Sequence, residues 1–339
     1  MNLLRKILFP FAVLYGFITG IRNFLYDKGI LKSYSFAIPV IAVGNLSVGG
    51  TGKTPQIEYL IRLLSPNYKI AVLSRGYKRK SEGFILAGAN TNAEEIGDEP
   101  FQFFRKFKNI QVAVDADRRN GITQLLSQPV KPDVVLLDDA FQHRKVKAGF
   151  YILLTAYDDL FYNDFMLPTG NLREGRSGAK RADIVIVTKC PASIPEAEQK
   201  QVKAKISKDM PVFFTYIDYD DAVFSNDKKL AVSEIQTVDK ILLAGIAKPE
   251  PFFAYLQAAK NKTMVFPDHH NFTGQDIESV MEKAANRMIV TTEKDFVRLE
   301  GKLPAEQLFY LPIKSAFINN ENEFNKTIID YVGKGSGNS

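Results

Sequence analysis

Short runs of apolar, largely β-branched residues alternate with stretches of mixed polarity along most of the chain. The first group of runs predicts strands at residues 40–45, 70–74, 110–114, 134–137, 151–155, 183–187 and 212–216. The intervening stretches have helical patterns, as expected when crossover helices cover both faces of a parallel sheet. The pattern therefore predicts an α/β domain built on a parallel sheet, which we place at residues 33–212.

A second group of strand-like runs predicts another, smaller sheet. These runs lie at residues 240–245, 263–266, 288–292 and 308–311. They follow a segment rich in Tyr, Asp and Lys, which we interpret as a linker at residues 213–229. We place a smaller α/β domain at residues 230–332, and we expect the Gly- and Ser-rich residues 333–339 to form a disordered tail.

The first 32 residues have a different composition. Fifteen uncharged residues, 7–21, separate Lys6 from Arg22, and they are rich in Phe, Leu, Ile and Val. This run is shorter than the roughly 20 residues that a spanning helix needs, and no small-residue cleavage site follows it. Of the net charge of +6, +4 falls within residues 1–32. We expect a helix that lies on the cytoplasmic leaflet of a membrane; the alternative is a helix packed on the protein's own core.

The amino-acid composition excludes some classes of protein and of site. A chain of 339 residues with 45% hydrophobic and 24% charged residues has room for two soluble domains with proper cores. A single cysteine, Cys190, excludes an intrachain disulfide framework and suits a reducing compartment. With three histidines in the whole chain, a zinc site is not expected.

A glycine-rich loop follows the first predicted strand and precedes a helical stretch at residues 56–64. In such a loop the backbone N–H groups converge on phosphate, the lysine reaches the outer phosphates and the threonine is a Mg²⁺ ligand. The usual pattern has glycine at the position of Ser47, so the match is imperfect; the alternative is a simple strand-to-helix turn. The candidate nucleotide-binding residues are Ser47, Val48, Gly49, Gly50, Thr51, Gly52, Lys53 and Thr54.

Two pairs of acidic residues are candidates for the chemistry. The strand at 134–137 ends in Asp138 and Asp139, the pattern of a Walker B element whose carboxylates hold Mg²⁺. Asp98 and Glu99 precede Pro100, which suits the first turn of a helix. From the residues alone they are equally well explained as a general base with a further Mg²⁺ ligand or as acids that favour a helix N-terminus.

Histidine and arginine supply the remaining candidates. Asp268, His269 and His270 lie in one predicted loop, and histidine transfers protons readily near neutral pH. Arg118, Arg119 and Arg173 are candidate phosphate clamps. Each of these residues is also compatible with an exposed, purely structural position.

Six motifs, in this order, resemble the tetraacyldisaccharide 4′-kinases of lipid A biosynthesis over nearly the whole chain. They are residues 47–55, Ser74–Tyr77, Gly97–Pro100, Asp138–His143, Leu172–Glu174 and the Asp-His-His-x-Phe motif at 268–272. In that family the loop begins with serine. One departure is Ala140, where the family pattern often has glycine.

The resemblance implies a P-loop kinase that uses ATP and Mg²⁺ to phosphorylate the 4′-hydroxyl of a tetraacylated glucosamine disaccharide 1-phosphate at the cytoplasmic face of the inner membrane. It implies Asp98 as the base with His269 as its partner, and Arg118 or Arg119 together with Arg173 as phosphate-handling groups. The expected partners are that lipid and the membrane leaflet, with no nucleic acid, and we expect a monomer. Two rival hypotheses remain: a membrane-associated P-loop NTPase that acts on a partner protein, and a kinase of a soluble sugar.

Overall fold

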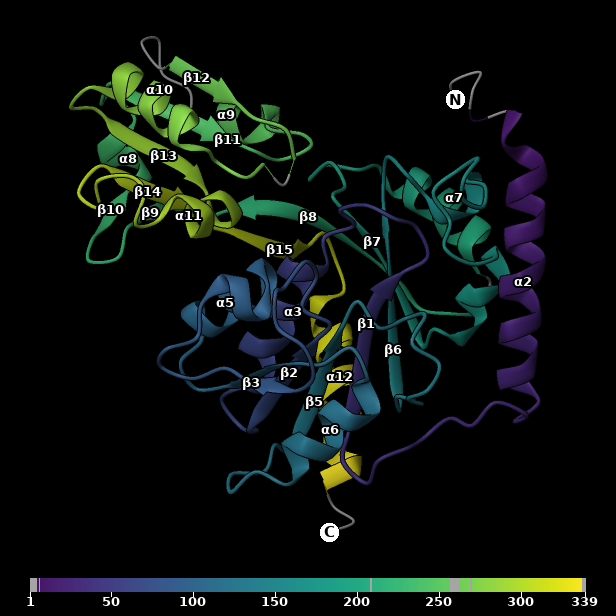
Figure 1. The fold of residues 1–339 in the computed structure, drawn as a ribbon. Helices are drawn as coiled ribbons and strands as arrows, with labels where there is room; N and C mark the ends of the chain where they lie inside the picture. The colour runs from purple at the N-terminus through teal and green to yellow at the C-terminus, as the bar shows by residue number, and fades with distance from the viewer. Residues whose placement is uncertain (1–4, 6, 208, 257–261, 269, 337–339) are drawn as a thin grey trace. The chain divides into compact units, whose positions relative to one another are not determined.

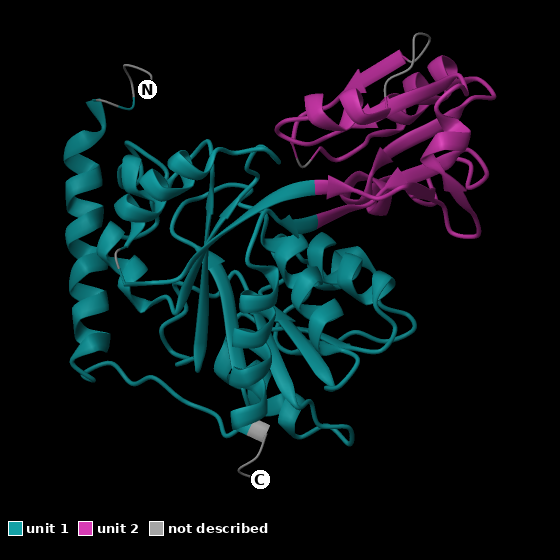
Figure 2. Ribbon diagram, turned by 180° about the vertical axis from the view of Figure 1, so that it is seen from behind, with its two compact units in different colours: residues 1–217, 315–339 teal, residues 218–314 magenta. Residues whose placement is uncertain are grey.

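The computed structural model describes residues 5, 7–207, 209–256, 262–268 and 270–336. These residues form two compact units, which Figure 2 shows in different colours. Unit 1 comprises residues 1–217 and 315–339, and unit 2 comprises residues 218–314. Each unit is built on its own mainly parallel sheet with helices, which confirms the predicted α/β class with a smaller second domain.

Among the described residues, the sheet of unit 1 has nine strands in the order β15-β8-β7-β6-β1-β5-β2-β4-β3 (Figure 1). The strand pairs from β8 to β4 are parallel, and β3 joins β4 in the antiparallel sense. The bounds are β1 Val40–Asn45, β2 Ile70–Ser74, β3 Ile85–Leu86, β4 Gln111–Val114, β5 Val134–Asp138, β6 Phe150–Ala156, β7 Ile184–Thr188, β8 Val212–Tyr219 and β15 Ile313–Phe317.

Alternate residues of these strands enter hydrophobic cores on opposite faces of the sheet. Ile41 packs with Leu60 of α3 and Phe324 of α12, whereas its neighbour Ala42 packs with Ile122 of α6. Burial on both faces explains why the strands are continuous apolar runs. The helices of unit 1 are α2 Phe9–Asp27, α3 Lys53–Leu64, α4 Ala93–Ile96, α5 Asp98–Lys106, α6 Arg118–Leu126, α7 Glu196–Ile206 and α12 Glu321–Ser336, with 3-10 turns η1 Phe161–Asn163 and η2 Arg176–Arg181.

Among the described residues, unit 2 has a six-stranded sheet in the order β10-β9-β14-β13-β11-β12. The strands are β9 Ala222–Phe224, β10 Lys229–Ala231, β11 Lys240–Ala244, β12 Lys262–Val265, β13 Met288–Thr292 and β14 Leu308–Leu311, and the helices are α8 Val232–Ile235, α9 Glu250–Leu256, α10 Gly274–Ala284 and α11 Glu293–Leu299. Its apolar residues form two cores of their own.

The C-terminal part of the chain differs from the expected domain bounds. We placed residues 315–332 in the smaller domain, but β15 joins β8 in the sheet of unit 1 and α12 packs on that sheet. The expected linker at 213–229 is largely strand, divided between the two units. Residues 333–336 of the expected disordered tail are helical instead, because α12 continues to Ser336. Gly335 packs closely on Pro39: a Cβ there would lie 2.5 Å from Cγ of Pro39. Residues 337–339 lie outside the described residues.

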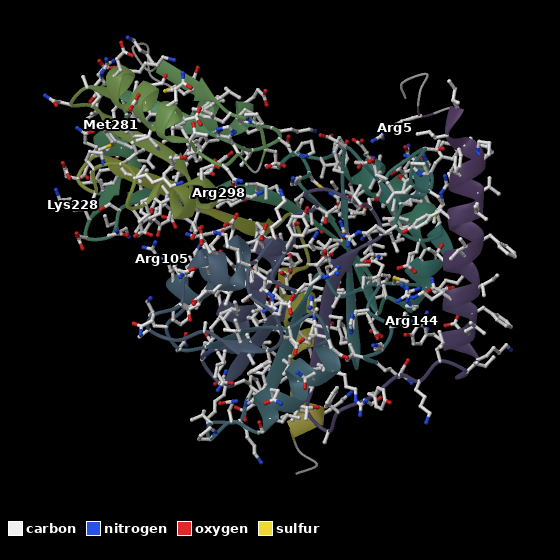
Figure 3. The ribbon with its side chains drawn as sticks, in the orientation of Figure 1. Arg5, Arg105, Arg144, Lys228, Met281 and Arg298 are labelled. Carbon is white, nitrogen blue, oxygen red and sulfur yellow. The ribbon has the colours of Figure 1, made fainter. Side chains whose placement is uncertain are left out.

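The N-terminal helix α2 presents polar residues to unit 1 and apolar residues to solvent. Ala12 is the one residue of α2 that is buried. In Figure 3, side chains project from α2 away from the sheet. The large apolar residues of the helix are 44–66% exposed: Phe9, Phe11, Val13, Leu14, Phe17, Ile18, Ile21 and Phe24. Among the described residues, no helix has the length and hydropathy required to cross a bilayer.

Candidate active site

The glycine-rich loop joins the end of β1 to the start of α3, which begins at Lys53, three residues earlier than predicted. Gly49 and Gly52 have φ angles of 117° and 80°, a region that strains any residue with a Cβ. Two residues at the end of β7 and just after it hold the loop: Thr188 Oγ1 donates to the carbonyl of Thr51 at 2.9 Å, and Lys189 Nζ donates to the carbonyl of Gly50 at 2.5 Å. The loop therefore has the form expected of a phosphate cradle.

The acidic pair lies beside this loop because β5 is the neighbour of β1 and runs parallel to it. Val43 is opposite Asp138 in the register, so both strands end at the same edge of the sheet. The turn after β5 approaches β1 so closely that a Cβ on Gly44 would lie 2.7 Å from Cβ of Phe141. Lys53 Nζ is consequently 3.6 Å from Asp139 Oδ1, which joins the two motifs in one site.

Asp138 is a buried carboxylate at this edge. Ser74 Oγ, at the end of β2, donates a hydrogen bond to its Oδ2 at 3.1 Å. Burial, followed by the charge of Asp139, raises the pKa of Asp138 to about 6, and Glu99 contributes to the same shift. A bound Mg²⁺ would relieve this cost, so the donor set of Asp138, Asp139 and Thr54 fits that cation.

We expect Asp138→Asn to stabilise the protein in the absence of metal and nucleotide. An Asp pKa of about 6 in the folded state exceeds the unfolded value of about 3.9, so the unfolded state releases the proton first as pH rises. The free energy of unfolding of the wild type therefore falls by about 3 kcal/mol between pH 4 and pH 6. The Asn variant avoids this fall, because asparagine does not ionise. The thermal midpoint of the variant should exceed that of the wild type at pH 8, with the gap closing toward pH 4. Equal midpoints at pH 8 would contradict this assignment.

Asp139 has a strained backbone and two cationic neighbours. Its φ is 46°, an uncommon value for a residue other than glycine. Arg173 binds both carboxylate oxygens, with Nη1 3.1 Å from Oδ2 and Nη2 3.0 Å from Oδ1. Burial acts to raise the pKa of Asp139, but the charges of Lys53 and Arg173 outweigh it and hold the pKa below its ordinary value. Asp139 is therefore ionised at neutral pH.

The two adjacent arginines have different environments. Arg118 is buried, and its Nη2 donates to the carbonyl of Asp138 at 2.9 Å. Burial lowers its pKa to about 10, so it remains charged at neutral pH. Arg119 is exposed, with its guanidinium 3.7 Å from the centre of the Tyr34 ring. The structure thus places Arg118 at the acidic pair and Arg119 outside it.

Asp98 and Glu99 open α5 at the carboxyl edge of the same sheet. Gly97 has φ 91°, and a Cβ there would lie 3.1 Å from the carbonyl oxygen of Tyr77, so the start of α5 packs on the loop after β2. The effect of Glu99 on the pKa of Asp138 places it within electrostatic reach of the Walker B acids.

The histidine motif belongs to unit 2. Asp268 pairs with Lys294 at 3.3 Å, and His270 Nε2 lies 3.0 Å from Asp276 Oδ2. His269, the predicted partner of Asp98, lies outside the described residues.

Three supporting residues were given no role in the site by the sequence predictions. Asn45 ends β1 and accepts a 2.5 Å hydrogen bond from Arg173, Ser74 ends β2 and binds Asp138, and Thr188 ends β7 and holds the P loop. Each is a polar residue that closes an apolar strand, which is the signal that would have identified it. Position 140 does not require glycine, because Ala140 does not have a positive φ.

Comparisons with known proteins identify the family of the chain. The sequence model of the tetraacyldisaccharide-1-P 4′-kinase family matches residues 4–333. A tetraacyldisaccharide 4′-kinase of Flavobacterium psychrophilum is 67% identical, with all of both chains covered, and one of Flavobacterium johnsoniae is 66% identical over 98% of each chain.

A solved structure gives the same result for the fold. The "apo" form of LpxK from Aquifex aeolicus, in complex with ATP, is 32% identical and superposes with a TM-score of 0.80, covering 97% of this chain and all of that one. A P loop beside paired acids and a family match over almost the whole length lead to one conclusion. The chain belongs to the tetraacyldisaccharide-1-P 4′-kinase family and is an ATP-dependent kinase.

Proposed function

We propose that this kinase works at the cytoplasmic leaflet of the inner membrane, where it transfers the γ-phosphoryl group of ATP to the 4′-hydroxyl of a tetraacylated glucosamine disaccharide 1-phosphate. Family membership supports the reaction and the lipid A precursor as its substrate. The observation that carries the chemistry is the 3.6 Å approach of Lys53 to Asp139 at the joint end of β1 and β5. The single cysteine and the use of ATP favour the cytoplasmic side.

The residues at the carboxyl edge of the sheet have different roles in phosphoryl transfer. Lys53 and the loop amides neutralise and orient the phosphates, and Arg118, which is buried beside Asp138, keeps positive charge at that edge. Mg²⁺, held by Thr54, Asp138 and Asp139, supplies further charge stabilisation when bound. Arg173 fixes the Asp139 carboxylate.

We assign the role of general base to Asp98 and the role of the group that orients this base to His269. Asp98 stands at the start of α5 on the sheet edge that carries the Walker B acids. A base and the group that orients it act on one proton transfer, so their losses should not add. A double-mutant cycle in which the penalties of Asp98→Ala and His269→Ala simply sum would remove His269 from this role.

The outer face of α2 supports a bilayer as the place of reaction. A substrate with four acyl chains leaves a membrane at a cost of roughly 0.8 kcal/mol per exposed CH₂, so the enzyme has to reach the lipid. The large apolar side chains of α2 are exposed, and Arg5, Lys28 and Lys32 add cations near its ends that suit anionic headgroups.

We expect the double variant Phe11→Asp/Phe17→Asp to bind anionic vesicles at least about 10-fold more weakly than the wild type, because the two rings are 62% and 66% exposed and would be buried in lipid. Val130→Asp, which changes a 55% exposed valine elsewhere in unit 1, is the matched control and should bind normally. High salt should weaken binding of the wild type only in part. Unchanged co-sedimentation of the double variant would contradict the membrane proposal.

The reaction itself is tested with ATP and a total lipid extract. Mass spectrometry should find one lipid, an acylated disaccharide, that gains a single phosphate. ATP hydrolysis without a phosphorylated lipid would favour the NTPase alternative, and a phosphorylated water-soluble sugar would favour the soluble-sugar kinase.

A further inference from the structure

The inner face of α2 contacts the segment that carries Arg173. Tyr15 Oη donates a hydrogen bond to the backbone carbonyl of Arg173 at 3.0 Å. Two turns later on the same side of the helix, Asn23 Nδ2 donates to Glu174 Oε2 at 2.8 Å. Since Ala12 is the one buried residue of α2, polar contacts such as these help to seat the helix on unit 1.

The other side of this segment is attached to the P loop. The N–H of Val48 donates to the carbonyl of Asn171 at 2.8 Å, and the N–H of Arg173 donates to the carbonyl of Leu46 at the same distance. An isolated antiparallel bridge joins Ser47 to Leu172. Residues 171–174 therefore form a short extended piece between α2 and the start of the P loop.

Glu174 ties the same helix to the turn after the Walker B acids. Its side chain is 3% exposed. Oε1 accepts hydrogen bonds from Arg181 at 2.8 Å and from Gln142 at 3.0 Å, while Oε2 accepts the bond from Asn23. Gln142 also donates to the carbonyl of Asn45, so the network reaches the end of β1. A buried carboxylate that loses one of its donors is poorly compensated, and its neighbours must move.

These contacts surround Arg173, whose guanidinium donates hydrogen bonds to both carboxylate oxygens of Asp139. A shift of its backbone carbonyl or of the neighbouring carboxylate changes where that guanidinium lies. Phosphoryl transfer depends on such placement, because displacement of a charged group by about 1 Å can cost 10²-fold in rate.

We propose that Tyr15 and Asn23 are positioning residues for phosphoryl transfer: through the backbone of Arg173 and the carboxylate of Glu174, the inner face of α2 sets the place of the Arg173 guanidinium on Asp139. The proposal rests on the proposed kinase function. It assigns the two faces of α2 different tasks, the outer face attachment to lipid and the inner face placement of an active-site arginine.

The test compares Asn23→Ala and Tyr15→Phe with Thr19→Ala. Thr19 lies between the two on the same side of α2, but its hydroxyl donates to carbonyls of its own helix, Tyr15 and Gly16, so its loss leaves residues 171–174 untouched. With detergent-dispersed acylated disaccharide 1-phosphate as substrate, Asn23→Ala should lower kcat about 10-fold and Tyr15→Phe several-fold, with KM for ATP nearly unchanged. Thr19→Ala should keep the wild-type kcat.

A second comparison separates positioning from general structural support. In an Arg173→Ala background, Asn23→Ala should cause no further loss, because its effect passes through that arginine. Losses that multiply, or a wild-type kcat for both Asn23→Ala and Tyr15→Phe, would overturn the proposal. If Asn23→Ala does not fold, Tyr15→Phe carries the same test. Vesicle binding is measured separately: a protein that fails to bind vesicles but shows these kcat effects refutes the membrane proposal and leaves this inference standing.

Discussion

Replacing Lys53 with alanine is expected to reduce phosphoryl transfer by about 10³-fold or more while leaving the fold intact. The side chain is 19% exposed and points to the carboxyl edge of the sheet, where its Nζ lies 3.6 Å from Asp139 Oδ1. It belongs to none of the hydrophobic cores, so its loss removes charge stabilisation and little else. The measurement is kcat/KM with the lipid substrate, alongside the far-UV circular dichroism spectrum.

Lys69→Ala is the matched control for this substitution. Lys69 is exposed and directly precedes β2, at the opposite edge of the same parallel sheet. It should have wild-type activity. A Lys53→Ala protein that keeps more than about a tenth of the wild-type rate would contradict the nucleotide site, because a P-loop lysine contributes far more than this.

Asp139→Asn should cause a loss of similar size, about 10³-fold or more. Asparagine is a better substitution than alanine here, since it tolerates the φ of 46° and keeps the side-chain shape. It removes the negative charge that Lys53 and Arg173 face and that would hold Mg²⁺ in the proposed site. The expected signature is a fall in kcat that added Mg²⁺ restores only in part.

Asp133→Asn serves as its control, because Asp133 lies just before β5, at the other end of that strand, and accepts a hydrogen bond from the backbone of Lys69 that asparagine can also accept. Equal activities of the two variants would show that Asp139 is not part of the catalytic apparatus.

The motifs that carry the chemistry were predictable because they are local. An apolar run followed by Gly-Thr-Gly-Lys-Thr specifies strand, loop and helix within about 25 residues, and the run ending in Asp138 does the same for β5. Most strand bounds agree with the predictions to within one residue, since burial on both faces demands continuous apolar segments.

Contacts between segments that are distant in the chain could not be predicted from the sequence. The polar residues Tyr15, Thr19 and Asn23 recur every four positions inside an apolar segment, which indicates a polar face, but Arg173 and Glu174 lie about 150 residues away and nothing local points to them. The return of β15 to the sheet of unit 1 likewise depends on pairing with β8, which is remote in sequence. The glycines after residue 332 led us to predict a disordered tail, although α12 continues to Ser336. Gly335 instead allows close packing against Pro39.

The fate of the γ-phosphate of ATP distinguishes lipid phosphorylation from the two alternatives. Vesicles that contain the tetraacylated disaccharide 1-phosphate are incubated with the protein and with ATP labelled in that group. We expect equal molar amounts of ADP and of lipid phosphorylated at the 4′-hydroxyl, and no label in the lipid with Lys53→Ala. Label recovered as inorganic phosphate, or in a water-soluble product, with none in the lipid would contradict this expectation.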